Sequence, residues 1–431
     1  MADPDVLTLA SELIRIDTTN PGDGTGRERP AAEYVAEKLG EAGIDATLIE
    51  SAPNRANVVA RIAGTDPGRA PILVHGHLDV VPAEAADWSV HPFSGEVRDG
   101  LLWGRGAVDM KGMDAMMLAV VRAWAREGRR PRRDVVLAFT ADEEASAAHG
   151  STWLVTKHAD LFEGITEGIS ESGGYTFHAG GRRLYPVAAG ERGTAWLKLT
   201  ARGRAGHGSR VNHDNAVAAL AGAMHRLAEY EWPVRLTPTV RASIEGIGAA
   251  LGVPVDLSAD AAVQATVARF GPARELVEAV LRNSSNPTML SAGYKVNVIP
   301  ETATGYVDGR VVPDARDEFE ATVASLIGPS VAWEYEHAEV ALSADPSSAT
   351  FAAMADALRA EDPGAHVVPV CMAGGTDAKQ FSRLGITGYG FAPLRMPPDL
   401  DYSALFHGVD ERVPVDALEF GVRVLDRFLT T

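Results

Sequence analysis

The sequence Pro71-Ile-Leu-Val-His-Gly-His-Leu-Asp-Val-Val-Pro82 is a near-continuous apolar run with a proline at each end. Such a run is typical of a strand that is buried on both faces and lies in the middle of a sheet. Residues 134–142, Asp-Val-Val-Leu-Ala-Phe-Thr-Ala-Asp, predict a second strand of this kind. Between them, residues 113–126 have the apolar spacing of a helix. Strands that alternate with helices predict an α/β layer structure around a largely parallel sheet.

The pattern of predicted elements changes near residue 190 and changes back near residue 315. The block between these points predicts strand, helix and two further strands, at residues 193–201, 216–230, 295–299 and 304–312. Helical patterns return afterwards, at residues 317–327, 348–360 and 415–429. We therefore expect a discontinuous domain of residues 1–190 and 315–431, interrupted by a smaller α+β domain of residues 191–314.

Composition narrows the class of protein. The chain of 431 residues allows two or three domains, and 40 basic against 58 acidic residues give a net charge of −18. That charge argues against a nucleic-acid binder, which needs a basic face to neutralise phosphates. Cys371 is the only cysteine, which excludes an internal disulfide and favours a reducing, cytoplasmic setting. The acidic start at residues 1–5 does not resemble a signal peptide, and no segment approaches the roughly 18 apolar residues of a membrane span.

Candidate catalytic residues follow the predicted strands. His77 and Asp79 lie at the carboxyl end of the first buried strand, where open α/β sheets bind their ligands. Their spacing projects both side chains to one side of an extended backbone, so that Asp79 could orient the imidazole. Asp109 lies in a glycine-rich turn before a helix, Gly104-Arg-Gly-Ala-Val-Asp-Met-Lys-Gly112, which matches neither of the phosphate-binding glycine motifs. A surface histidine and a helix-capping aspartate are the ordinary alternatives.

Asp142-Glu143-Glu144 comes directly after the second apolar strand. Adjacent acids are usually only solvated charges. Here their position after a buried strand favours a site at the edge of the sheet. One carboxylate could bind a cation while its neighbour, which faces the other way, holds or deprotonates water.

Together these motifs resemble the M20 family of metallohydrolases, which holds acetylornithine deacetylase, succinyl-diaminopimelate desuccinylase, aminoacylase-1 and carboxypeptidase G2. The similarity covers nearly the whole chain, through Ile14-Arg-Ile-Asp-Thr-Thr-Asn-Pro21, His77-Leu-Asp-Val-Val-Pro82, the turn around Asp109, Asp142-Glu-Glu144 and His407. It implies a three-layer catalytic domain with two zinc ions and a smaller lid or dimerisation domain.

The resemblance also implies the metal ligands. His77 resembles a ligand of one zinc ion, and Asp109 resembles the carboxylate that bridges both ions. Glu144 resembles a ligand of the other ion, and Glu171 and His407 resemble the remaining ligands. Three acidic ligands and one hydroxide would balance the charge of two dications, whereas converging carboxylates without a cation would repel one another. Oxygen and nitrogen ligands suit zinc, with manganese or cobalt as substitutes.

Other positions resemble the residues that act on the substrate. Glu143 resembles the general base, and Asp79 resembles the residue that orients the histidine ligand. In relatives, the counterpart of His207 reaches into the active site of a partner subunit and stabilises the oxyanion, which implies a homodimer. A turn histidine among glycines is the alternative. Further resemblance implies contacts to the substrate carboxylate or carbonyl from Asn297, Arg310 and the loop of Gly374, Gly375 and Thr376.

The sequence thus predicts a dinuclear zinc hydrolase that cleaves an amide bond in a small, carboxylate-bearing substrate such as an N-acyl amino acid. An M20-type dipeptidase or carboxypeptidase is nearly as good an interpretation, because no residue fixes the acyl pocket. A non-catalytic binding relative is a remote alternative, since every catalytic position is filled. A serine hydrolase and a one-zinc protease are excluded, because the chain has neither G-x-S-x-G nor H-E-x-x-H.

Overall fold

Strand β3 (Ile72–His77) lies in the centre of the larger of two main sheets, as its apolar sequence predicts. All six of its residues are buried. It pairs in parallel with β6 (Val135–Thr140) on one side and with β7 (Glu167–Ser170) on the other. The computed structural model describes residues 5–431, so the first four residues of the acidic start lie outside the described residues.

Within the described chain, the larger sheet has ten strands. Its centre is parallel and its outer pairings are mostly antiparallel, which confirms the predicted α/β class. The order is β1 (Ala46–Ala52), β2 (Arg55–Ile62), β6, β3, β7, β18 (Thr387–Gly390), β9 (Arg182–Glu191) and β16 (Leu342–Ser343), with β8 (Phe177–Ala179) and β17 (Ala365–Met372) also paired to β9.

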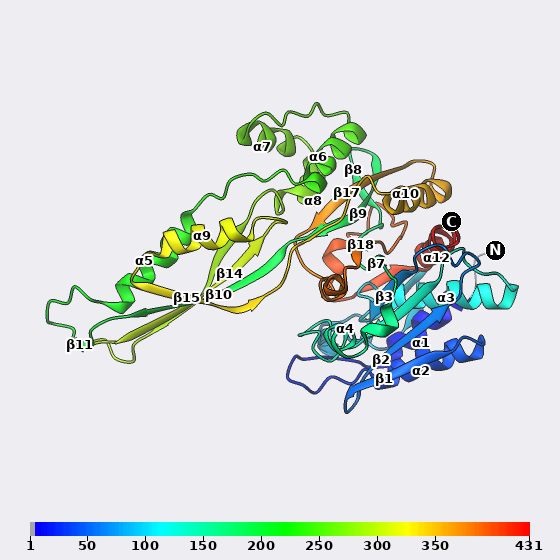
Figure 1. The fold of residues 1–431 in the computed structure, drawn as a ribbon, viewed down its shortest axis with the longest axis horizontal. Helices are drawn as coiled ribbons and strands as arrows, with labels where there is room; N and C mark the ends of the chain where they lie inside the picture. The colour runs from blue at the N-terminus through cyan, green and yellow to red at the C-terminus, as the bar shows by residue number, and fades with distance from the viewer. Residues whose placement is uncertain (1–4) are drawn as a thin grey trace.

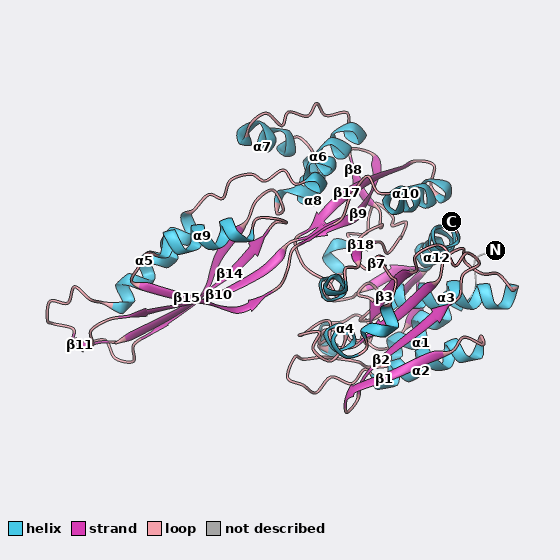
Figure 2. Ribbon diagram, viewed as in Figure 1, coloured by secondary structure: helices cyan, strands magenta, loops and turns pink. Residues whose placement is uncertain are grey.

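Helices cover both faces of this sheet and complete three layers (Figure 2). One face shares a large apolar core with α1 (Asp5–Arg15), α2 (Arg29–Glu41), α3 (Lys111–Glu127), α10 (Ala349–Glu361) and α12 (Val415–Thr430). The other face packs against α4 (Ser151–Lys157) and α11 (Ala378–Phe381) around a smaller core. Helix α3 ends where Gly128 adopts a left-handed conformation, with φ of 64°, that other residues rarely take.

A single residue, Arg192, separates β9 from β10 (Gly193–Arg202), and the chain passes there from the larger sheet to a second, antiparallel sheet (Figure 1). The order of the second sheet is β12 (Ser284–Ala292), β14 (Thr302–Val311), β10 and β15 (Val331–Ala338). Helices α5 (Ala216–Glu229) and α9 (Arg316–Ile327) pack on it around a separate core. This packed unit runs on to β15, past residue 314, and the division of the chain into domains at residues 191 and 314 stays a prediction.

Residues 238–281 lie between two strands of the second sheet in sequence but pack on the larger sheet. Their helices are α6 (Pro238–Leu251), α7 (Asp260–Ala268) and α8 (Glu275–Glu278), none of which the sequence pattern predicts. Helix α6 begins where the Thr237 hydroxyl accepts a hydrogen bond from the amide of Val240, with a proline in the first turn. Its apolar side, with Ile244 and Ile247, shares a core with Val368 of β17.

Short strands complete the fold. β4 (Glu96–Arg98), β5 (Leu101–Trp103) and β19 (Arg412–Pro414) form a three-stranded sheet beside the larger one, and β11 (Gly206–His207) pairs with β13 (Val298–Ile299). β11 lies at the end of the elongated molecule that is remote from β3 (Figure 1). Among the described residues, no helix combines the length and the apolar character that a membrane crossing requires.

Candidate metal centre

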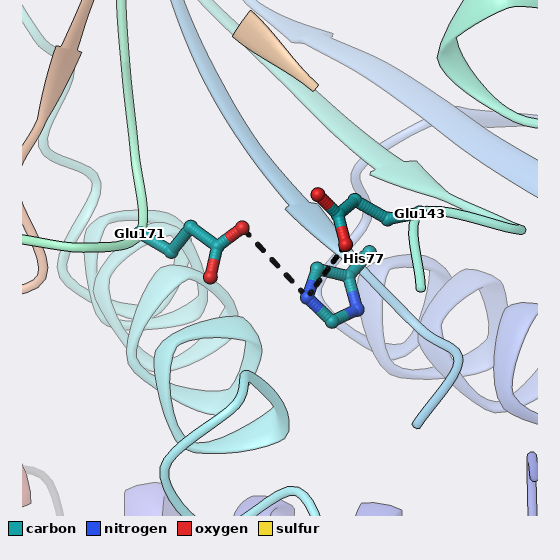
Figure 3. A group of neighbouring side chains, drawn as sticks. All are labelled: His77, Glu143 and Glu171. Atoms are coloured by element: carbon teal, nitrogen blue, oxygen red, sulfur yellow. Dashed lines mark ion pairs between the residues drawn. The ribbon is translucent and has the colours of Figure 1, made fainter. Parts of the chain in front are cut away.

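Three of the predicted metal ligands follow the central strands of the larger sheet. His77 is the last residue of β3, Glu144 follows β6, and Glu171 directly follows β7. The carboxyl ends of parallel strands meet at one edge of a sheet, which brings these side chains together. Figure 3 shows the imidazole of His77 between the carboxylates of Glu143 and Glu171.

The Asp109 carboxylate lies between two histidines. Its Oδ1 is 3.0 Å from Nε2 of His77, and its Oδ2 is 3.2 Å from Nε2 of His407. Beyond the histidines, Glu171 Oε1 lies 3.8 Å from His77 Nε2, and Glu144 Oε2 lies 3.0 Å from His407 Nε2. Each oxygen of Asp109 therefore contacts one histidine, and each of these histidines also lies near a glutamate. The structure brings all five predicted ligands together, although they come from distant parts of the chain.

Glu143, Glu144 and Glu171 resist ionisation, whereas hydrogen bonds with His407 and His77 outweigh burial and lower the pKa of Asp109. Burial raises the pKa of Glu143 and of Glu171 well above the ordinary range, and neighbouring carboxylates add to the effect. Burial also raises the pKa of Glu144. Hydrogen bonds to Asp109 and Glu144 raise the pKa of His407 to about 10. A cluster with these properties favours a bound dication, because the cation stabilises the carboxylates in their charged form and displaces their protons.

The donor atoms fit a metal ion on two further counts. Oε1 of Glu144 is buried and has no hydrogen-bond partner within residues 5–431, so one strong acceptor is left for another ligand. The sets His77, Glu143 and Glu171, and His77, Asp109 and Glu144, each place their donor atoms within 4.8 Å of one another. Imidazole nitrogens and carboxylate oxygens are ligands that zinc and similar dications accept. These residues could therefore hold metal.

Asp79 supports the cluster mainly by binding the backbone amides of the turn that carries Glu143 and Glu144. Its carboxylate oxygens accept hydrogen bonds from the amides of Glu143 and Glu144, both at 3.1 Å, and Oδ2 also accepts one from Asn20 at 2.9 Å. Its carbonyl oxygen lies 3.0 Å from Nδ1 of His77, whereas its carboxylate is 3.6 Å away. Asp79 therefore contacts both the imidazole and the turn that carries the two glutamates. The sequence pattern did not reveal the contact to the amides.

Three buried ion pairs that the sequence did not reveal hold the turns of the site. Arg55 pairs with Glu28 at 2.6 Å and with Asp142 at 2.7 Å, directly before the two glutamates. Glu411 pairs with Arg105 at 2.8 Å, and accepts hydrogen bonds from the amides of residues 108 and 109 at 2.6 and 3.0 Å. The peptide bond between residues 109 and 110 is cis.

The predicted substrate contacts do not all lie near the ligands. His207 and Asn297 lie beside the short β11–β13 pair, where the amide of Gly208 donates to the carbonyl oxygen of Asn297 at 2.9 Å. That pair is at the end of the molecule remote from β3 (Figure 1). Arg310 lies on β14, and its guanidinium group pairs with Asp308 at 2.7 Å. Within one chain the structure therefore keeps His207 and Asn297 away from the metal ligands.

The loop that contains Gly374, Gly375 and Thr376 lies closer to the site. Thr376 donates from its amide and its hydroxyl to Glu191, at 3.0 and 2.7 Å. The next residue, Asp377, is buried and accepts a hydrogen bond from Thr140 at 2.6 Å and another from Ser151. Burial raises the pKa of Asp377 to about 6. This loop thus links the end of β6 to the junction between the two sheets.

Comparisons with known proteins identify the family of this chain. Residues 73–431 match peptidase family M20/M25/M40. The chain is 28% identical over 383 residues to N-fatty-acyl-amino acid synthase/hydrolase PM20D1 of Homo sapiens, which covers 84% of this chain and 74% of that protein. It is 27% identical over 432 residues to aminoacylase-1 of Sus scrofa, which covers 98% and 94% of the two chains.

A solved structure shows the same fold. The M20 family metallo-carboxypeptidase Sso-CP2 from Sulfolobus solfataricus superposes with a TM-score of 0.72 at 19% identity, over 99% of this chain and 98% of that chain. The similarity extends over both sheets, since it includes nearly the whole length. The chain is a hydrolytic enzyme and belongs to peptidase family M20/M25/M40.

Proposed function

We propose that the protein is a metal-dependent amidohydrolase that removes the acyl group from N-acyl amino acids. The proposal rests on the Asp109 carboxylate, whose two oxygens contact His77 and His407, with Glu171 and Glu144 beyond these histidines. Two ion sites that share a carboxylate suit a two-metal hydrolase. The names of PM20D1 and aminoacylase-1 describe chemistry on acyl amino acids, which favours this reaction over a dipeptidase or carboxypeptidase.

Two Zn²⁺ ions per chain are the proposed cofactors. His77, Asp109 and Glu171 would hold one ion, and Asp109, Glu144 and His407 would hold the other. The same nitrogen and oxygen donors accept Co²⁺ or Mn²⁺ as substitutes. When bound, such ions polarise the scissile carbonyl group and make water more acidic.

Glu143 is the proposed general base and acid. The Oε2 atom of Glu143 is 4.0 Å from Nε2 of His77. Unlike Asp109, Glu144 and Glu171, Glu143 is not assigned as a metal ligand. It would take a proton from the attacking water and return this proton to the amide nitrogen as the carbon–nitrogen bond breaks. Asp79 would position this residue, because it binds the amides of Glu143 and Glu144.

His207 is proposed to serve the active site of a partner subunit in a homodimer. The imidazole would donate a hydrogen bond to the developing oxyanion there. Two observations support this role: the distance of β11 from β3 in one chain, and the exposed apolar residues near β11 (Figure 1). These residues lie on the edge strand β12 and the loop after it, and they are Met289, Leu290, Tyr294 and Val296. An exposed apolar edge strand is typical of an interface between chains.

The carboxylate of the substrate is proposed to bind Arg310, Asn297 and the loop of Gly374, Gly375 and Thr376. A guanidinium group recognises a carboxylate through two parallel hydrogen bonds, and Arg310 already binds one in Asp308. The substrate is thus a small molecule, and we propose no nucleic-acid or membrane partner. A cytoplasmic setting is proposed because the one thiol, that of Cys371, is buried and free.

The test is the release of free amino acid from a matched panel. N-acyl amino acids and dipeptides with the same carboxyl-terminal residue are given to chelator-treated protein before and after Zn²⁺ is added. We expect the zinc-loaded protein to cleave the N-acyl amino acids faster, and the chelator to abolish the reaction. Faster cleavage of the dipeptides would favour the peptidase alternative. No cleavage of either class by the zinc-loaded protein would contradict the proposed function.

A further inference from the structure

A cavity of about 250 Å³ borders the proposed metal centre. Part of its wall is formed by the residues that follow Glu171 and by Phe406, which precedes His407. The end of β17 and helix α8 complete it. Lining side chains from these segments include Tyr175, Phe406, Met372, Cys371, Leu276 and Val280. The cavity therefore lies next to two of the proposed ligands without containing any of them.

The lining of this cavity is apolar. Tyr175, Tyr402 and Phe406 pack as a group of aromatic rings, with centroids 4.8 to 6.4 Å apart, and two of the three face the cavity. Burial raises the pKa of the Cys371 thiol to about 12, as expected in apolar surroundings. No lysine, arginine or histidine is among the lining residues of the described chain, and Glu275 is the one charged side chain.

This distribution of charge decides which end of a substrate enters. A carboxylate would meet the negative charge of Glu275 and no compensating cation, so the carboxyl end of an N-acyl amino acid is disfavoured here. The acyl end carries no charge and can bury its carbon atoms against the aromatic rings. Because the cavity is lined by Ser172 and Phe406, which adjoin Glu171 and His407 in the chain, an amide carbonyl at the ligands would leave its acyl chain beside Phe406.

We propose that this cavity is the acyl pocket and that it takes an apolar acyl group of about eight heavy atoms, such as octanoyl or benzoyl. The inference rests on the proposed function. A volume of 250 Å³, at about 30 Å³ for each group of the size of water, holds roughly eight such groups. An acetyl group would fill only a small part of it, and a palmitoyl chain would extend outside.

Helix α8 supplies the site at which the pocket can be altered. Ala279, at the end of α8, is exposed and lines the cavity, and its helical backbone conformation accepts a larger residue. Glu278 is exposed on the same helix and does not line the cavity. Ala279→Trp therefore fills the pocket, and Glu278→Trp is the matched control, since it adds the same side chain one position away.

The first test measures kcat/KM for N-acetyl and N-octanoyl forms of one amino acid with zinc-loaded protein. Each buried methylene group raises kcat/KM by up to about fourfold, so the wild-type protein is expected to prefer octanoyl over acetyl by more than about tenfold. Ala279→Trp should lower this ratio at least about tenfold, while Glu278→Trp should keep it within about twofold.

The second test does not depend on turnover. An acyl chain that fills the pocket should also strengthen binding. In the zinc-loaded Glu143→Gln variant, the N-octanoyl amino acid should bind more than about tenfold more tightly than the N-acetyl form, as measured by calorimetry. Ala279→Trp in the same background should remove the difference between the two ligands.

Each outcome decides between the two proposals. Hydrolysis of N-acyl amino acids with no preference for octanoyl, an unchanged ratio in Ala279→Trp and equal binding of the two ligands would overturn the pocket and leave the proposed function intact. No hydrolysis at any acyl length by the zinc-loaded wild-type protein would overturn the proposed function, and the pocket with it. A lower ratio in Ala279→Trp but not in Glu278→Trp, together with tighter binding of the octanoyl form, would support both.

Discussion

Glu143 and Glu144 are neighbours in sequence but have different surroundings. Glu144 contacts His407, whereas Glu143 faces His77 and, across it, Glu171. The turn that separates them from β6 begins at Asp142, whose φ of 68° is uncommon for a residue other than glycine. Arg55 and Asn20 bind the Asp142 side chain and hold it in this conformation. One dipeptide can thus supply both a ligand and a base.

The two glutamates should therefore respond differently to loss of charge. Glu143→Gln should lower kcat by about 10²- to 10⁴-fold, the usual contribution of a general base, and should leave the bound metal unchanged. Glu144→Gln should instead lower the metal content, because it removes a charged ligand. Metal analysis beside kcat separates the two effects. Glu143→Gln with near wild-type kcat would contradict the assignment of the base.

Asp79 offers a second test at this scale. In Asp79→Asn, an NH₂ group replaces one of the two carboxylate oxygens. It must therefore face the backbone N–H of either Glu143 or Glu144, which is also a donor. We expect this to leave one buried donor unpaired at a cost of about 1–3 kcal/mol and to lower kcat, because both glutamates shift. Thermal unfolding and kcat should fall together. An Asp79→Asn variant with unchanged stability would show that these two hydrogen bonds do not hold the turn.

The proposed metal ligands could be named from the sequence, whereas the residues that hold them could not. His77 and Glu144 follow apolar strands, which is a local pattern, and the resemblance to a family located Asp109, Glu171 and His407. The ion pairs of Arg55 with Glu28 and of Arg105 with Glu411 join residues far apart in the chain. No local sequence pattern predicts such an ion pair, because its two residues meet only in the folded protein.

At the scale of the elements, β9 and β10 connect the two sheets almost without interruption. Glu191, the last residue of β9, accepts two hydrogen bonds from Thr376 in the loop beside the metal centre. The return connection, after β15, contains Glu339, which pairs with the buried Lys379 at 3.1 Å. Both connections between the sheets therefore contact the segment 376–380, which ties the junction to the active site.

Glu191 predicts a pH dependence of stability. Burial raises its pKa from 4.5 to about 7, even though Lys379 opposes the shift. The folded protein thus holds this proton more tightly than the unfolded chain, and the stability that it contributes is lost as the pH rises through 7. The Glu191→Gln side chain cannot ionise. The melting temperature of this variant minus that of the wild-type protein should therefore rise by a few degrees between about pH 5 and about pH 8. A difference in melting temperature that does not change with pH would show that Glu191 does not retain its proton in the folded protein.

Secondary structure was predictable where the pattern was long and regular. The helices at α3, α10 and α12 and the strands β3 and β6 agree with the sequence to within a few residues. In residues 238–281, α7 and α8 are short and have no long apolar stripe, and the 14-residue helix α6 was not predicted either. They form because β17 offers an apolar surface from a distant part of the chain. This contact also creates the cavity beside α8, which the sequence did not predict.

At the scale of the whole molecule, the distance between β11 and β3 gives a test of the homodimer (Figure 1). Glu143→Gln and His207→Ala should each be nearly inactive. If each site takes His207 from the partner, a mixed dimer has one complete site, and an equal mixture of the two variants should recover roughly a quarter of wild-type activity after subunit exchange. Mass measurement in solution checks that dimers form. A mixture that stays inactive would contradict a shared active site.

Hydrolysis measured as a function of bound metal tests the proposed two-metal site most directly. Zn²⁺ is titrated into chelator-treated protein while the bound zinc and the release of amino acid from an N-acyl substrate are followed together. We expect activity to rise until two zinc ions are bound per chain. Asp109→Ala, which lacks the shared carboxylate, should bind fewer ions and stay inactive. Full activity without bound metal, or in Asp109→Ala, would contradict the proposed two-metal site.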